Sequence, residues 1–202
     1  MPSERVPTVF IVDDDSDVRE TLCLMFRNAG FECESYASGE EFLAAYGPNW
    51  SGCIVLDLRL DDKMTGLEVQ AELTALGART PVIVLSAYAD VSTTVKAVRC
   101  GAIDVLEKPF DTAALLNRVR VAIEEDTGAR GHESLLAARM ASLSQRQREV
   151  MRLLIAGKRT KEIARQLAIS PKTVEKHRAN VLVKMRVESV VDLMRLVMES
   201  RN

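Results

Sequence analysis

The first 123 residues alternate short apolar runs with amphipathic stretches, and this alternation restricts the folds open to the chain. The apolar runs are TVFIV (8–12), FECESY (31–36), CIVLDL (53–58), PVIVL (81–85) and IDVLEK (103–108). The amphipathic stretches span 16–28, 39–46, 66–76, 91–100 and 112–123. Strands and helices in such alternation form a parallel sheet with right-handed crossovers and helices on both faces. We therefore predict an α/β domain with five parallel strands.

Polar side chains stand where four of these runs end. Asp13 and Asp14 follow the first run, Asp57 ends the third, Ser86 follows the fourth and Lys108 ends the fifth. On the stretch VDDDSD alone, helix capping and a cation site are equally good explanations. The carboxyl ends of parallel strands, however, share one edge of the sheet, where ligands bind in this class of fold. Neighbouring carboxylates repel one another without a cation, so the convergence favours a Mg²⁺ site with oxygen ligands.

Charge divides the chain into two unequal parts. Residues 1–138 carry 12 Lys and Arg against 23 Asp and Glu, whereas residues 139–202 carry 15 against 6. An acidic part joined to a basic part indicates two domains, and the basic one is a candidate for binding nucleic acid. A basic face that is merely solvated is the ordinary alternative.

Composition and cysteine usage indicate the environment of the protein. With 47% hydrophobic and 28% charged residues, the sequence suits a soluble chain with real cores. No apolar run approaches the length of a membrane span, and the N-terminus has no export signal. The four cysteines form no CxxC pair, so we expect no zinc site and interpret them as reduced core thiols of a cytoplasmic protein.

The basic part is predicted to be helical throughout. SQRQREVMRLLIAG begins with Ser144 as an N-cap, Thr160 can cap a second helix, and Ser170 before Pro171 starts a third, PKTVEKHRANVLVKM. A fourth helix is expected over 189–199. Two short helices joined by IS form a helix-turn-helix pattern, in which the second helix enters the major groove of DNA. A plain four-helix bundle is the alternative, and the basic outward face of the third helix argues against it.

Both parts resemble known families. VDDD, VLDLRL, VLSA and EKPF together resemble the receiver domain of two-component response regulators, over about residues 7–123. The basic part, over about residues 142–198, resembles the LuxR-type helix-turn-helix, and the domain order resembles NarL/FixJ-type response regulators. The resemblance implies a flavodoxin-like sheet of order 2-1-3-4-5, followed by an all-α four-helix domain. We expect a receiver domain over 1–123, a partly helical linker over 124–142 and a DNA-binding domain over 143–202.

The receiver resemblance implies a role for each residue at the strand ends. Asp57 would accept a phosphoryl group from a histidine kinase, Lys108 would pair with the phosphoryl oxygens, and Ser86 would donate a hydrogen bond to one of them. The Mg²⁺ ligands would be Asp13, Asp14, Asp57 and the backbone carbonyl of Arg59. Phosphoryl transfer mostly requires positioning and charge neutralisation, which a metal ion and an ammonium group supply. The resemblance also implies a cis peptide bond after Lys108.

Four positions depart from the family patterns. In DLRLDDKMTG, Asp61 replaces the usual Pro, and one additional residue precedes Gly66. Val105 stands where Tyr or Phe usually acts as a rotating switch; Tyr88 is a candidate substitute, although a surface aromatic is the simpler interpretation. In the basic part, Gln147 replaces a Glu, which weakens an internal polar contact but leaves the DNA-binding surface unchanged.

The LuxR resemblance divides the side chains of the third helix of the basic part between two tasks. Those expected at base edges are Glu175, Lys176 and Ala179. Those expected at phosphates are Lys172, Thr173, His177, Arg178 and Lys184. Base-edge contacts select the sequence, whereas phosphate contacts position the protein without selecting it.

These features predict a phosphorylation-controlled transcription regulator rather than an enzyme. Phosphorylation is expected to pair two receivers through the segments 91–100, 103–108 and 112–123, so that a homodimer binds double-stranded promoter DNA. The unphosphorylated chain is expected to be a monomer. Two alternatives stay open: a phosphoryl sink with a vestigial basic domain, and an atypical receiver that binds metal or a partner but is never phosphorylated.

Overall fold

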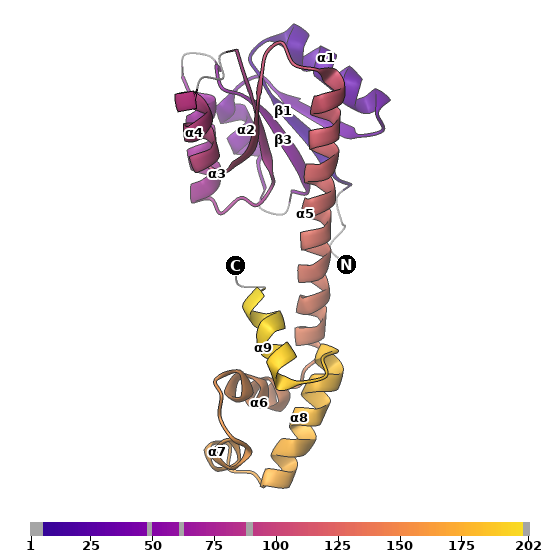
Figure 1. The fold of residues 1–202 in the computed structure, drawn as a ribbon, viewed down its shortest axis with the longest axis vertical. Coiled ribbons are helices and arrows are strands. Elements are labelled where there is room, and N and C mark those ends of the chain that lie inside the picture. Colours follow the sequence, from indigo (N-terminus) through magenta and orange to yellow (C-terminus); the bar gives the residue numbers. More distant parts are fainter. Residues whose placement is uncertain (1–5, 48–49, 61–62, 88–90, 200–202) are drawn as a thin grey trace. The chain divides into compact units, whose positions relative to one another are not determined.

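The chain forms two compact units. The computed structural model describes residues 6–47, 50–60, 63–87 and 91–199. The first unit is Met1–Ala129 and the second is Arg130–Asn202. Within the described residues, the first unit contains a sheet and the second contains helices only (Figure 1).

The first unit is built on a five-stranded parallel sheet of order β2-β1-β3-β4-β5, which confirms the predicted fold. The strands are β1 (Thr8–Val12), β2 (Glu32–Tyr36), β3 (Gly52–Asp57), β4 (Val82–Ser86) and β5 (Ala102–Glu107). The helices that alternate with them are α1 (Ser16–Asn28), α2 (Gly39–Ala45), α3 (Gly66–Ala75), α4 (Val91–Arg99) and α5 (Thr112–Ala141). Every residue of β1, β3 and β4 is buried, as expected for apolar runs that are covered on both faces.

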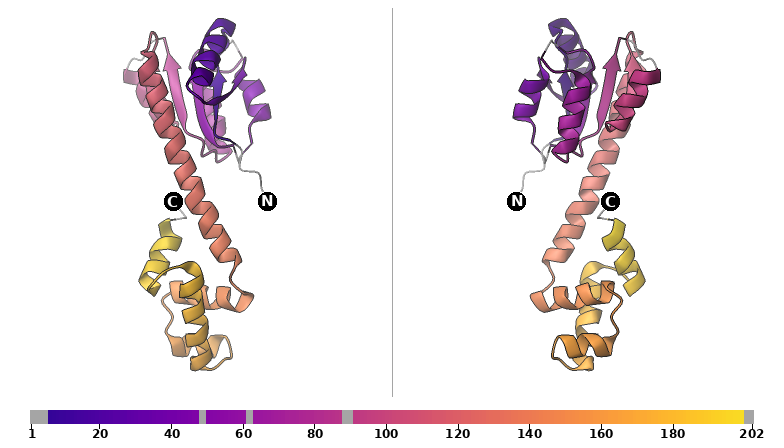
Figure 2. Two further views of the ribbon diagram at one scale, coloured as in Figure 1. Left: turned by 90° about the vertical axis from the view of Figure 1, so that its right-hand side faces the viewer. Right: turned by 90° about the vertical axis from the view of Figure 1, so that its left-hand side faces the viewer.

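Successive side chains of the strands enter two separate cores. On one face, Val9 packs with Phe26 of α1 and Leu115 of α5. On the other face, Phe10 packs in a cluster that includes Val69 of α3. The period of two along each strand therefore places α1 and α5 on one side of the sheet and α2, α3 and α4 on the other (Figure 2).

Helix α5 corrects the predicted linker. The sequence predicted a linker over 124–142 that is only partly helical, but α5 is continuous to residue 141. The buried carboxylate of Asp126 accepts hydrogen bonds from the Ser51 hydroxyl (2.9 Å) and the Gly52 amide (3.1 Å), which hold this part of α5 against the start of β3. A glycine inside a helix costs roughly 1 kcal/mol relative to alanine. Helix α5 contains two glycines, Gly128 and Gly131, and the hydrogen bonds of Asp126 offset their cost to helix stability. The residues around the glycines do not indicate these bonds, because Ser51 and Gly52 are distant in the sequence.

The second unit contains four further helices with clear start signals. They are α6 (Gln145–Ile155), α7 (Thr160–Gln166), α8 (Pro171–Met185) and α9 (Val190–Glu199). Ser144 and Ser170 are the N-caps of α6 and α8, as predicted. The predicted cap at Thr160 is wrong, because Thr160 is the first residue of α7 and Arg159 occupies the N-cap position. The backbone amide of Arg159 donates to Glu162 Oε2 at 2.8 Å, so a carboxylate of the first turn holds this helix start.

The last turns of α5 belong to the core of the second unit. Leu136 is 8% exposed and packs in a cluster with Leu143, Met151 and Val181. Arg139 Nη1 donates to the carbonyl oxygen of Met185 at 3.2 Å, and this bond satisfies a carbonyl at the C-terminal end of α8. The core of the helical unit therefore begins before residue 143.

We predict that Leu136→Ala lowers the free energy of unfolding of the second unit by about 2–5 kcal/mol, because it leaves a cavity among the residues that hold α8. Hydrogen exchange of the α8 amides in the full chain measures this change. The matched control is Leu135→Ala, at a side chain that is 55% exposed, which should change stability by less than about 0.5 kcal/mol. Equal exchange rates in both variants would show that α5 adds nothing to this core.

Candidate functional site

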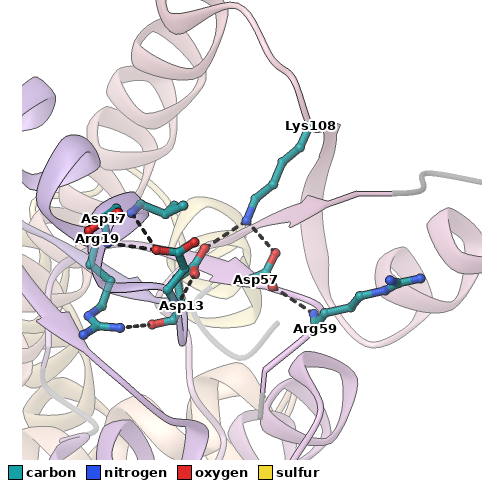
Figure 3. Close-up of polar contacts among 8 residues, drawn as sticks. Asp13, Asp17, Arg19, Asp57, Arg59 and Lys108 are labelled. Carbon is teal, nitrogen blue, oxygen red and sulfur yellow. Dashed lines mark hydrogen bonds and ion pairs between the residues drawn. The ribbon is translucent and has the colours of Figure 1, made fainter.

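Three aspartates, Asp13, Asp14 and Asp57, meet at the carboxyl edge of the sheet. Figure 3 shows two of them, Asp13 and Asp57, next to Lys108. Asp13 follows β1 and Asp57 ends β3, and both are buried, whereas Asp14 is exposed. One carboxylate oxygen from each of the three lies within 4.8 Å of the others. Oxygen atoms so close together suit a hard cation such as Mg²⁺, which prefers carboxylate, carbonyl and water ligands.

The ammonium of Lys108 partly neutralises this acidic cluster. Lys108 Nζ lies 2.9 Å from Asp13 Oδ2 and 2.9 Å from Asp57 Oδ1. Burial raises the pKa of Asp57, while the bond from Lys108 acts in the opposite direction. Burial alone would lower the pKa of Lys108, but the bonds to the two aspartates outweigh it and raise that pKa. One ammonium group facing three carboxylates leaves negative charge for a divalent cation to balance, so the residues present fit Mg²⁺.

The three consecutive aspartates have different tasks. Asp13 Oδ1 accepts the backbone amide of Asp15 at 3.0 Å, and its carbonyl oxygen accepts Arg19 Nη1 at 2.7 Å (Figure 3). Asp15 is the N-cap of α1, accepting the amides of Asp17 and Val18. Capping therefore explains the third aspartate, and the cation site uses the first two. The contribution of Arg19 was not predicted, because nothing in the local pattern shows that its side chain turns back to the strand end.

The loop after the acceptor strand is held close to Asp57. The backbone amide of Arg59 donates to Asp57 Oδ2 at 3.0 Å, and the amide of Gly66 donates to the Leu58 carbonyl at 3.0 Å. A Cβ atom at residue 66 would lie 2.3 Å from the Asp57 carbonyl oxygen, so only glycine permits this approach. Asp61 lies outside the described residues.

Ser86, the remaining residue predicted at the strand ends, also lies at this edge. Ser86 ends β4 and is buried, and its carbonyl oxygen accepts the backbone amide of Lys108 at 2.8 Å. The peptide bond between Lys108 and Pro109 is cis, as the resemblance implied.

Val105, at the position of the usual switch residue, is partly buried and packs against the core on the α2, α3 and α4 side of the sheet. Tyr88, the candidate substitute for the switch residue, lies outside the described residues.

Helix α8 separates a buried face from an exposed polar face. Val174, Val181 and Met185 are buried among α6, α7 and α9. Six of the residues predicted to contact DNA are exposed on this helix: Lys172, Glu175, Lys176, Arg178, Ala179 and Lys184. A short helix, a tight connection and a longer helix with an exposed basic face constitute the geometry of a helix-turn-helix.

Residues 9–120 match the family model of the response regulator receiver domain, and residues 141–197 match that of the luxR family of bacterial regulatory proteins. The chain belongs to the response regulators that join these two domains. It is 41% identical to the transcriptional regulatory protein FixJ of Azorhizobium caulinodans over 198 residues, which cover 96% of this chain and 93% of FixJ. The response regulator protein TodT of Pseudomonas putida is 36% identical over 197 residues, covering 96% of this chain and 86% of TodT.

Solved structures of response regulators share the fold. The structure of the response regulator StyR matches with a TM-score of 0.71 and 38% identity, covering 96% of this chain and 99% of StyR. Full-length FixJ from B. japonicum matches with a TM-score of 0.57 and 35% identity, covering 96% and 97% of the two chains. Both domains of the present response regulator therefore have solved relatives in the same order. The family of this chain is one of transcription regulators.

Two of the residues predicted to contact phosphate make internal contacts in this response regulator. The Thr173 hydroxyl lies 2.8 Å from the Ser170 hydroxyl at the start of α8. Lys184 Nζ donates to the Ser142 carbonyl (2.7 Å) and to Gln147 Oε1 (3.0 Å). Nδ1 of His177 is buried and has no hydrogen-bond partner among the described residues. Helices of membrane-spanning length and apolarity are absent from the described part of the chain.

Proposed function

We propose that Asp57 of this response regulator accepts a phosphoryl group from a histidine kinase, and that this modification promotes receiver pairing and promoter binding. The observation that carries the proposal is the position of Lys108, whose ammonium lies 2.9 Å from both Asp57 and Asp13. Such a group is already placed to neutralise charge that arrives on Asp57. Phosphoryl transfer depends chiefly on positioning and on charge neutralisation of this kind.

Each residue at the strand ends has a task in this proposal. Asp13, Asp14, Asp57 and the Arg59 carbonyl would hold Mg²⁺, which when bound withdraws charge from the phosphoryl oxygens. A carboxylate oxygen of Asp57 attacks the phosphorus of the kinase phosphohistidine, the P–N bond breaks and the histidine leaves, while the Arg59 amide fixes the rotamer of the Asp57 carboxylate. Lys108 then exchanges its contact with Asp57 for one with a phosphoryl oxygen, and the Ser86 hydroxyl donates to another. The chain thereby assists its own phosphorylation and dephosphorylation.

We predict that Asp57→Asn abolishes labelling of the full chain by acetyl phosphate in the presence of Mg²⁺, because an amide oxygen is a poor nucleophile. Phosphate analysis by mass spectrometry measures the labelling. Chelation of Mg²⁺ should have the same effect on the unchanged protein, because the uncompensated carboxylates repel the incoming phosphoryl group. Asp111→Asn, at an exposed aspartate, is the control and should be labelled normally. Labelling that persists in Asp57→Asn and maps to another aspartate would contradict the assignment, and an unlabelled wild-type chain would favour the atypical receiver.

The proposed pairing surface lies on α4, β5 and the receiver part of α5. Val95 and Val98 on α4 and Ile103 on the edge strand β5 are 42%, 53% and 53% exposed. Asp104 and Arg118, which also lie on this surface, form an ion pair with each other within one chain. Exposed aliphatic side chains on an edge strand and its neighbouring helix suit a self-complementary contact between two receivers.

We predict that acetyl phosphate doubles the mass of the full chain in light scattering and that Ile103→Asp prevents the doubling without preventing labelling, because it places a charge in an apolar contact. Leu76→Asp, at an equally exposed leucine at the end of α3, is the matched control and should still dimerise. A fully labelled wild-type chain that stays monomeric would exclude pairing. Release of the basic domain would then be the mechanism.

Helix α8 is proposed to read DNA in the major groove. Its exposed Glu175, Lys176 and Ala179 would face base edges, and Lys172, Thr173, His177, Arg178 and Lys184 would contact phosphates. The charge distribution supports this proposal, because residues 139–202 hold 15 of the 27 basic residues. An exposed basic helix face would have no task in a phosphoryl sink, so this alternative is disfavoured.

We predict that Lys176→Ala relaxes sequence preference, whereas Arg178→Ala weakens binding to specific and random duplexes alike and lowers the salt slope by about one unit. The physical difference is that a base-edge contact discriminates by about 1–3 kcal/mol, whereas a phosphate contact releases counterions from any sequence. Titration of phosphorylated protein into both duplexes at several salt concentrations measures the two effects. Equal losses on both duplexes in the two variants would contradict this orientation of α8.

A further inference from the structure

Two cysteine thiols of the receiver domain lie in direct contact. Cys23 is in α1 and Cys33 is in β2, and their Sγ atoms are 3.1 Å apart. The S–S bond of a disulfide is about 2.05 Å long, so the two sulfur atoms are roughly 1 Å from bonding distance. The contact belongs neither to the phosphoacceptor site nor to the DNA-binding surface.

The position of the pair gives a small reagent access to it. The two residues are buried, with 9% and 7% of their surface exposed, so a reagent reaches them through local opening of the structure. Strand β2 is an edge strand of the sheet, and its residues Glu32, Glu34 and Ser35 are exposed. Edge strands open locally at lower free energy than central strands, and such opening admits a small oxidant. Cys53, in contrast, lies on the central strand β3 and is fully buried.

We propose that Cys23 and Cys33 form an oxidant-sensitive dithiol, which a peroxide converts into an intramolecular disulfide between α1 and β2. In the first step, one sulfur attacks a peroxide oxygen, the O–O bond breaks, and a sulfenic acid and one water form. In the second step, the other sulfur attacks the sulfenic sulfur, the S–O bond breaks and a second water leaves. Two thiols lose two electrons and two protons in total, and one peroxide is reduced to two waters.

Because of the environment of the pair, the reaction requires a high concentration of peroxide. Burial and the hydrogen bond with the Cys23 thiol raise the pKa of the Cys33 thiol. Thiolates rather than thiols attack peroxides, so the pair stays reduced at low peroxide concentration. Once one sulfur is oxidised, the adjacent thiol captures it faster than further peroxide can. Cys23 also lies one helical turn after Arg19, whose side chain holds the Asp13 carbonyl, so the bridge would form next to a support of the acceptor site.

The test is peroxide treatment of the folded full chain, followed by alkylation of free thiols and peptide mass spectrometry. We expect a protein that is lighter by two hydrogen atoms, a crosslink between the peptides that carry Cys23 and Cys33, and reversal by dithiothreitol. Because trypsin leaves Cys33 and Cys53 in one peptide, Cys53→Ala provides the unambiguous map, and the crosslink should persist in it. It should also persist in Cys100→Ala.

Thermal unfolding gives a second reading. The bridged protein should melt several degrees above the reduced protein, because the crosslink restricts the unfolded chain. Cys23→Ser and Cys33→Ser should show neither the crosslink nor the shift. Mixed cysteine pairings are expected when oxidation is carried out in urea, where native proximity is lost. Two results for the wild-type protein would overturn the proposal: oxidation of both thiols to sulfinic acids without this crosslink, or free thiols that survive an excess of peroxide. Both are measured on the unchanged chain, and neither depends on phosphorylation of Asp57.

Discussion

The ammonium of Lys108 bridges carboxylates at the ends of two other strands, and the geometry of the acidic cluster depends on this contact. Asp13 and Asp57 follow neighbouring central strands, so their charges lie together where little water can screen them. Without a nearby cation, that cluster would be strongly unfavourable. Lys108 neutralises part of this negative charge. It follows β5, which is separated from β3 by β4, and its long side chain spans that distance. The same contact places the positive charge where a phosphoryl group would arrive.

Backbone contacts give the acidic cluster its geometry. The Arg59 amide orients Asp57, the Asp15 amide orients Asp13, and the close approach of Gly66 holds the following loop against the end of β3. These bonds are made by main-chain groups, so they depend on local fold more than on side-chain identity. The loop that departs from the family pattern therefore still meets Asp57 through a glycine. Charge sets the chemistry of this site, and the backbone sets its shape.

In the second unit, Gln147 stands where the family usually has Glu, and its side-chain amide joins α6 to α8. Gln147 Oε1 accepts both the Ser144 amide (2.9 Å) and Lys184 Nζ (3.0 Å), so it completes the capping box of α6 and contacts α8. A Glu side chain could accept the same two bonds, but it would also neutralise the charge of Lys184. The substitution therefore preserves the junction between α6 and α8 and leaves an additional positive charge on the basic domain. The predicted weakening of this contact concerns its electrostatic part only.

The sequence by itself determined the alternation of strands and helices, the convergence of Asp13, Asp57 and Lys108, and the exposed face of α8. Each of these follows from local periodicity or from the rule that parallel strands end at one edge. The tertiary structure alone decided that α5 continues through two glycines, since the compensating bonds to Asp126 come from a distant strand. It alone decided that Arg19 supports the acidic pair, because the direction of a long side chain depends on what surrounds it. Helix and strand preferences are properties of neighbouring residues and can be seen in the sequence. Contacts between residues that are distant in the sequence form only when the chain folds.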